Sequence, residues 1–273
     1  MCNACLIDTV KRRMLSRRDL LKGAAAGALG AGALGALPGA LPVSLAQGAR
    51  TVSDLTHELH PDFPTYFGEP GFAMTRKFSF AEQGFNLFDL SINEHTGTHI
   101  DAPLHFSADG ASVAEIAVSD LVCPLCVVDI REKAEGDADA QLTPDDLQAW
   151  IDANGEIPDN ACVAMNSGWA RHVDTERFRN VTDETMHFPG FHPEAAQMLL
   201  ERNVAGIAVD TLSLDFGRSA DFAVHYAWLP AGRWGIECLA GLDGMPAAGA
   251  TLIVGAPKHR GGSGGPSRVM ALV

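Results

Sequence analysis

Residues 121–130, with the sequence LVCPLCVVDI, form a short and nearly continuous apolar run. A run of this length that carries almost no charge is typical of a strand buried on both faces of a sheet. The next secondary-structure signal along the chain is Thr143-Pro144-Asp145-Asp146, where Thr143 is suited to cap a helix and Pro144 to occupy its first turn. We therefore expect a helix through Ile151, and the strand and helix together predict an α/β unit.

The same alternation continues on both sides of this unit. A second helix is expected from His192 through Glu201, where Pro193 occupies the first turn and the apolar positions fall on one side. Further strands are expected at residues 51–59, 85–93, 161–165, 204–209, 234–239, 250–254 and 268–273. No internal repeat and no linker indicates a second domain. The sequence predicts a single α/β domain with a mixed β-sheet.

Composition narrows the classes of partner. The formal net charge is −14, and no basic patch follows the first residues of the chain. Phosphate binding relies on clustered Lys and Arg, so we expect no nucleic-acid partner and no anionic membrane surface. Cys123 and Cys126 form a C-x-x-C pair, but no second pair with zinc-ribbon spacing follows, and we interpret them as core thiols.

The first 46 residues have the pattern of an export signal. Ser16-Arg17-Arg18-Asp19-Leu20-Leu21-Lys22 leads into an uncharged Gly/Ala/Leu stretch, and Ser44-Leu45-Ala46 supplies the small residues that a signal peptidase accepts. We predict a twin-arginine signal peptide at residues 1–46, a mature domain at 47–273, and a periplasmic or extracellular location with no stable membrane span after cleavage. The alternative is an uncleaved amphiphilic anchor.

The segment from His95 to His105 carries the functional signal. It contains three imidazoles and the carboxylate of Asp101 within eleven positions, and side chains of this kind are costly to bury without a ligand. His99 and Asp101 are two residues apart and would point to the same side of an extended strand. Imidazole and carboxylate donors together suit Zn²⁺, Mn²⁺ or Fe²⁺. The sequence therefore predicts a divalent metal site.

This segment, HTGTHIDAPLH at residues 95–105, resembles the H-x-G-T-H-x-D-x-P-x-H signature of the cyclase-like metal-dependent hydrolases, which include bacterial kynurenine formamidase and isatin hydrolase. The resemblance extends from about Asp54 to the C-terminus. It includes the segments Phe63-Pro64, Asn166-Ser167-Gly168-Trp169, Phe188-Pro189-Gly190 and Val209-Asp210-Thr211-Leu212-Ser213-Leu214-Asp215, together with His225 and Glu237.

The resemblance implies a role for each site residue. His95, His99 and Asp101 would bind a first metal, and Asp101 could bridge to a second metal held by His225 and Glu237. His105 would be the catalytic acid/base. The resemblance also implies one or two Zn²⁺ or Mn²⁺ ions per chain, a swivelling β/β/α arrangement and a homodimer. This chain departs from many relatives at Ser167-Gly168-Trp169 and at residues 228–233, which leaves the substrate open.

The expected function is hydrolysis of an amide bond in a small molecule. Metal-activated water would attack the carbonyl carbon while His105 moves the proton. The resemblance favours an aryl formamide such as N-formylkynurenine or a cyclic amide such as isatin. Candidate contacts are the aromatic residues Phe63, Tyr66, Phe67 and Trp169 and the hydroxyls of Thr98 and Ser213, all of which could equally be structural.

Three other functions are alternatives to this one. A lactone or ester hydrolase could use the same residues. An exported metal-binding or solute-binding protein without turnover would need a closed ligand shell. A serine-nucleophile enzyme lacks support, because the sequence contains no G-x-S-x-G elbow, and the glycines around Ser263 are typical of turns.

Overall fold

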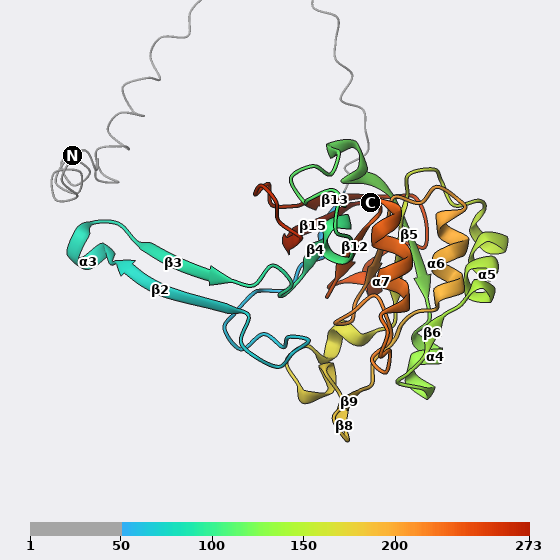
Figure 1. Ribbon diagram of the computed structural model, residues 1–273, viewed down its shortest axis with the longest axis horizontal. Coiled ribbons are helices and arrows are strands. Elements are labelled where there is room, and N and C mark those ends of the chain that lie inside the picture. The colour runs from blue at the N-terminus through green and yellow to red at the C-terminus, as the bar shows by residue number, and fades with distance from the viewer. Residues whose placement is uncertain (1–50) are drawn as a thin grey trace, which may run out of the picture. The chain divides into compact units, whose positions relative to one another are not determined.

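The computed structural model describes residues 51–273 (Figure 1). The predicted signal peptide at 1–46 and its junction with the mature domain at 47 lie outside the described residues. The described chain divides into a small unit, Met74–Leu90, and a larger unit made of the residues before and after it. The larger unit holds the predicted metal ligands.

The larger unit is built on one nine-stranded mixed sheet. Its strands lie in the order β1 (Val52–Asp54), β15 (Arg268–Leu272), β13 (Ala250–Gly255), β5 (Val122–Asp129), β7 (Cys162–Asn166), β11 (Gly206–Val209), β12 (Trp234–Glu237), β4 (His99–Asp101) and β14 (Gly264–Pro266). The central strands β5, β7, β11 and β12 pair in parallel, and every pairing outside them is antiparallel. The predicted α/β class with a mixed sheet is confirmed.

Three helices contribute to the core on one face of this sheet: α5 (Pro144–Asn154), α6 (Pro193–Leu200) and α7 (Ala223–Trp228) (Figure 1). Side chains alternate along the strands, so Cys126 and Val128 of β5 pack into the helix-side core, whereas Leu125 and Val127 pack into the core of the opposite face. Thr143 caps α5 by accepting a hydrogen bond from the Asp146 backbone N–H, as the sequence predicted. Cys123 and Cys126 are buried free thiols, which confirms their interpretation as core residues.

The remaining elements are short. Helix α4 (Arg131–Gly136) follows β5, strand β6 (Gln141–Leu142) pairs in parallel with β10 (Gly190–Phe191), and β8 (Val181–Thr182) pairs with β9 (Thr185–Met186). A 3₁₀ turn at Pro103–Phe106 follows β4 and carries His105. Within residues 51–273, the helices are all too short or too polar to cross a bilayer.

The small unit lies within a hairpin formed by β2 (Phe72–Phe78) and β3 (Leu87–Ile92), with helix α3 (Phe80–Gln83) at its turn (Figure 1). Strand β3 falls within the predicted strand at 85–93, but β2 was not predicted from the sequence. Two contacts define the faces of the hairpin, since Lys77 pairs with Asp89 and Arg76 lies over the Phe88 ring. Alternation from Phe88 places Leu90 on the same, more apolar face.

Candidate metal centre

Two paired strands bring three of the predicted ligands together. Strand β4 carries His99 and Asp101, and it pairs with β12 so that Glu237 is the direct partner of His99. Directly opposite residues of an antiparallel pair place their side chains on the same face of the sheet. The register of two strands separated by more than 130 residues therefore assembles two carboxylates and an imidazole.

The fourth ligand comes from the first turn of α7. Asp215 accepts hydrogen bonds from the backbone N–H groups of Val224 (2.8 Å) and His225 (3.1 Å), which are donors that the start of the helix leaves unpaired. The same carboxylate lies 2.6 Å from Nδ1 of His225. Asp215 therefore both anchors the helix and orients the imidazole.

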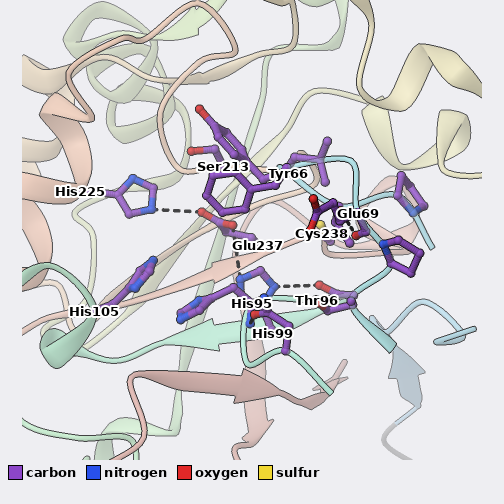
Figure 2. Close-up of a pocket in the computed structure, with 18 of the residues that line it drawn as sticks. Tyr66, Glu69, His95, Thr96, His99, His105, Ser213, His225, Glu237 and Cys238 are labelled. Atoms are coloured by element: carbon purple, nitrogen blue, oxygen red, sulfur yellow. Dashed lines mark hydrogen bonds and ion pairs between the residues drawn. The ribbon is translucent and has the colours of Figure 1, made fainter. Parts of the chain in front are cut away.

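The four side chains form a buried cluster, and Figure 2 shows three of them, His99, His225 and Glu237. Asp101 is fully buried, and His99, His225 and Glu237 are between 3% and 7% exposed. Nε2 of His99 lies 3.3 Å from Oδ1 of Asp101 and 3.4 Å from Oε2 of Glu237. Nε2 of His225 lies 3.6 Å from Oδ2 of Asp101 and 3.2 Å from Oε1 of Glu237. Each carboxylate thus presents one oxygen to His99 and the other to His225.

The hydrogen bonds of the histidine rings leave one nitrogen of each free for a metal. Nδ1 of His99 lies 2.8 Å from the carbonyl oxygen of Gly97, and Nδ1 of His225 is held by Asp215. Nε2 of His99 and Oδ2 of Asp101 are buried without a hydrogen-bond partner in the described chain. Metal-binding histidines usually donate the N–H of their second ring nitrogen to an oxygen acceptor, as the Nδ1 contacts of His99 and His225 allow. These nitrogen and oxygen donors fit a divalent metal ion.

The protonation of the cluster points to the same conclusion. Burial favours the neutral form of Asp101, but contacts with His225, His95 and His99 outweigh it and hold the pKa of this carboxyl well below its usual range. Burial lowers the pKa of His99, yet the Asp101 and Glu237 carboxylates raise it to about 10. The buried carboxylates therefore require a compensating positive charge, and a divalent cation can supply it in place of a proton.

His95 and His105 lie beside this cluster. Nδ1 of His95 is 2.7 Å from Oδ1 of Asp101. His105 stacks on His95 with ring centroids 3.7 Å apart and an interplanar angle of 18°. Burial lowers the pKa of His105 to about 4, against the opposing effect of Asp101, so its imidazole is neutral at pH 7. The structure thus brings together all six residues that the sequence singled out, although His95, Asp101 and His105 could also act as a ligand group.

A cavity of about 420 Å³ opens onto the cluster. Its walls include the aromatic side chains of Tyr66, Phe67, Phe106 and Phe222. Ser213 lines it with a buried hydroxyl that has no hydrogen-bond partner within the described chain (Figure 2). The only acidic residues in the lining are Glu69 and Glu237, and no Lys or Arg of residues 51–273 contributes to it.

Three of the predicted substrate contacts are structural instead. Phe63 and Trp169 are 3% and 2% exposed and belong to a separate hydrophobic cluster with Phe178. The Thr98 hydroxyl donates to the carbonyl oxygen of Cys238 (2.6 Å) and accepts from the backbone N–H of His57 (2.9 Å). Both partners are backbone groups, so Thr98 fixes the loops around the site. Tyr66 and Phe67 do line the cavity.

Sequence reasoning assigned no role to Asp215. The sequence did carry a signal for Asp215. This residue ends the segment 210–215, which follows the buried strand β11 directly and contains four polar residues, and ligand-facing residues collect at this end of the strands in α/β sheets. Its partner His225 is ten residues away, in a helix whose N-cap residue, Phe222, has a left-handed backbone and makes no side-chain cap. No spacing rule therefore predicted their contact.

Comparison with known proteins identifies the family of the chain. The family model described as Putative cyclase matches residues 53–216. Isatin hydrolase from Roseibium aggregatum is 32% identical over 252 residues, which are 85% of this chain and 95% of the relative. Kynurenine formamidase from Salinibacter ruber is 26% identical over 192 residues, covering 69% of this chain and 81% of the relative.

Solved structures give the same picture. Isatin hydrolase A from Labrenzia aggregata, bound to benzyl benzoate, superposes with a TM-score of 0.76 at 33% identity and covers 94% of this chain and 98% of its own. The region matched by the family model includes β4, which carries His99 and Asp101, whereas α7 and β12, which carry His225 and Glu237, follow its last matched residue. The family model spans more than half of the sequence, and the chain belongs to the cyclase family.

Proposed function

We propose that this chain hydrolyses the amide bond of an uncharged cyclic aryl amide such as isatin, with one or two Zn²⁺ or Mn²⁺ ions at the described cluster. Its similarity to isatin hydrolase and kynurenine formamidase indicates a hydrolase that cleaves amide C–N bonds other than peptide bonds. The observation that carries the choice of substrate is the aromatic cavity, which has no Lys or Arg in its described lining.

The charge of the cavity separates the two candidate substrates. N-formylkynurenine carries an amino-acid carboxylate, and enzymes usually bind such a group with Arg or with backbone donors. The cavity offers Glu69 instead, which would repel it. An uncharged bicyclic ring has no such penalty and can pack against Phe106 and Phe222. The benzyl benzoate bound by the relative from Labrenzia aggregata is also an uncharged aromatic molecule.

The residues of the cluster have distinct roles in this reaction. The metal would be held by His95, His99, Asp101, His225 and Glu237. Asp101 and Glu237 each present one oxygen to His99 and the other to His225, and this arrangement supports a site that could take two ions. A bound divalent cation supplies an acidified water and polarises the carbonyl oxygen. His105 is neutral, so it accepts the proton of the attacking water and returns it to the leaving nitrogen.

The test is a direct comparison of substrates on metal-defined protein. We would purify the chain from Gln47 onward, measure bound metal by elemental analysis, and follow isatin, N-formylkynurenine and an aryl lactone before and after chelation. We expect the highest kcat/KM for isatin and loss of turnover on chelation. A higher kcat/KM for N-formylkynurenine or for the lactone would overturn the proposed substrate. Bound metal without turnover of any of the three would favour the non-catalytic metal-binding alternative.

We also propose that the chain is exported through the twin-arginine pathway and works in the periplasm or outside the cell. The Arg17-Arg18 pair and the small residues before Gln47 support this. Expression of the full chain followed by N-terminal sequencing of the exported fraction tests it, and we expect Gln47 as the first residue. Replacing both arginines by Lys should retain the protein in the cytoplasm. Export of that variant at wild-type levels would contradict the proposed pathway.

A further inference from the structure

His95 is held from both sides of its ring. Nδ1 lies 2.7 Å from Asp101 Oδ1, and Nε2 lies 3.0 Å from the Ser263 hydroxyl oxygen. Ser263 precedes strand β14, and its carbonyl oxygen accepts a hydrogen bond from the Ala102 N–H (2.9 Å), beside the pairing of β14 with β4. The sheet therefore fixes the position of a serine that lies 168 residues from its histidine partner.

The direction of the hydrogen bonds around Ser263 follows from Glu94. The Glu94 carboxylate Oε2 lies 2.6 Å from the Ser263 hydroxyl and 3.1 Å from its backbone N–H. An ionised carboxylate only accepts hydrogen bonds, so the hydroxyl donates its single proton to Glu94. Ser263 can then only accept from His95, and the proton must be on Nε2.

A third residue fixes the carboxylate. Nε2 of His259 lies 2.6 Å from Oε1 of Glu94, so both oxygens of Glu94 are engaged. Gly262 lies directly against this contact and leaves no room for a side chain. A Cβ at position 262 would lie 2.1 Å from Nε2 of His259 and 2.6 Å from Oε1 of Glu94. Glycine at this position is therefore required for the contact between His259 and Glu94.

We propose that Ser263, Glu94 and His259 form a positioning network that keeps the proton of His95 on Nε2 and reserves Nδ1 for a divalent metal ion. This inference rests on the proposed metal-dependent function. It assigns His95 the opposite ring nitrogen from His99 and His225, whose Nδ1 atoms are held by other groups.

Metal affinity tests the network without relying on activity. Metal would be removed from the purified protein with a chelator, and the dissociation constants of Zn²⁺ and Mn²⁺ would be measured by competition. Loss of such outer contacts typically weakens metal binding by about 10- to 100-fold, which we expect for Ser263→Ala. Ser263→Thr keeps the hydroxyl and should restore most of the affinity. Gly262→Ala should weaken binding by displacing His259 from Glu94.

Gly244→Ala is the matched control, since a Cβ at position 244 meets no atom within 4 Å, and it should bind metal as the wild type does. Melting of the metal-free proteins shows whether each variant is folded. Wild-type affinity in Ser263→Ala would overturn the network while leaving the proposed function intact. Failure of the wild type itself to bind metal would instead remove the proposed function.

A second measurement reads the ring directly. Long-range ¹⁵N–¹H correlation spectra of the histidines distinguish the two nitrogens of each ring. In the zinc-loaded wild type we expect the His95 proton on Nε2 and the metal-shifted resonance at Nδ1. In Ser263→Ala the two forms should mix, and Ser263→Thr should recover the wild-type pattern. A metal-shifted Nε2 of His95 in the wild type would overturn the assignment.

Discussion

His105 differs from the other histidines of the site because no hydrogen bond to a described residue fixes its ring, while its pKa is lowered to about 4 by burial. A ligand needs a fixed nitrogen, whereas a proton carrier needs a neutral imidazole that can accept and release a proton. We predict that His105→Ala keeps its metal, as measured by elemental analysis, and loses kcat by about 10²- to 10⁴-fold. Loss of metal from this variant would make His105 a ligand instead.

Asp210 provides a prediction that does not depend on the reaction. Its carboxylate is 1% exposed and accepts hydrogen bonds from the hydroxyl of Ser167 (2.5 Å) and the N–H of Trp169 (2.8 Å). Burial is the largest effect and raises its pKa from 3.8 to about 6. Between these two values the unfolded chain ionises at Asp210 and the folded chain does not. The stability contributed by Asp210 is therefore present below pH 3.8 and lost as the pH rises through 6.

The measurement is the free energy of unfolding of the metal-free wild type and of Asp210→Asn, by urea denaturation at several pH values between 4 and 7. A pKa shift from 3.8 to about 6 predicts that the wild type loses about 2 kcal/mol relative to the variant across this range. Other titrating groups are common to both proteins and cancel in the difference. A difference independent of pH would show that Asp210 is ionised throughout.

At the scale of elements, α7 depends on a residue outside it. Its start at Phe222 has no side-chain cap, and Asp215 supplies the acceptor instead. We predict that Asp215→Asn weakens metal binding by about 10- to 100-fold, because the amide can donate to Nδ1 of His225 and place the proton on the ligand nitrogen. Asp221→Asn is the control, because Asp221 is exposed and its carboxylate accepts a hydrogen bond from the Ser219 hydroxyl rather than from the His225 ring. Equal metal affinity in Asp215→Asn and wild type would contradict this role.

The elements also show what sequence patterns can and cannot predict. Helix α5 was predicted because Thr143 and Asp146 are local, and the capping contact spans three residues. The ligand segment around His99 was predicted because residues two apart, such as His99 and Asp101, lie on the same side of an extended strand. Strand β14 and helix α7 were missed, since the first is a Gly-rich segment without apolar alternation and the second begins at an unfavourable backbone conformation. Ser263 was interpreted as part of a turn because its partners are 168 and 169 residues away.

At the scale of the whole molecule, we propose that the chain forms a homodimer through the hairpin of β2 and β3. One face of the hairpin carries Met74, Leu90 and Ile92, which are 52%, 57% and 42% exposed. A two-stranded hairpin is marginally stable alone in water, and exposed apolar faces of this kind mark interaction sites. A second copy of the chain presents the same face, so a twofold arrangement would bury both at once.

This proposal predicts opposite results for the two faces of the hairpin. Leu90→Glu places a charge on the apolar face and should convert the dimer to a monomer, as measured by light scattering after size-exclusion chromatography. Thr75→Glu introduces the same charge on the face of Lys77 and Asp89 and should leave the dimer intact. The metal content should stay the same in both variants, because the ligands lie in the larger unit. A wild-type monomer, or a dimer that Leu90→Glu leaves unchanged, would show that this face serves another purpose.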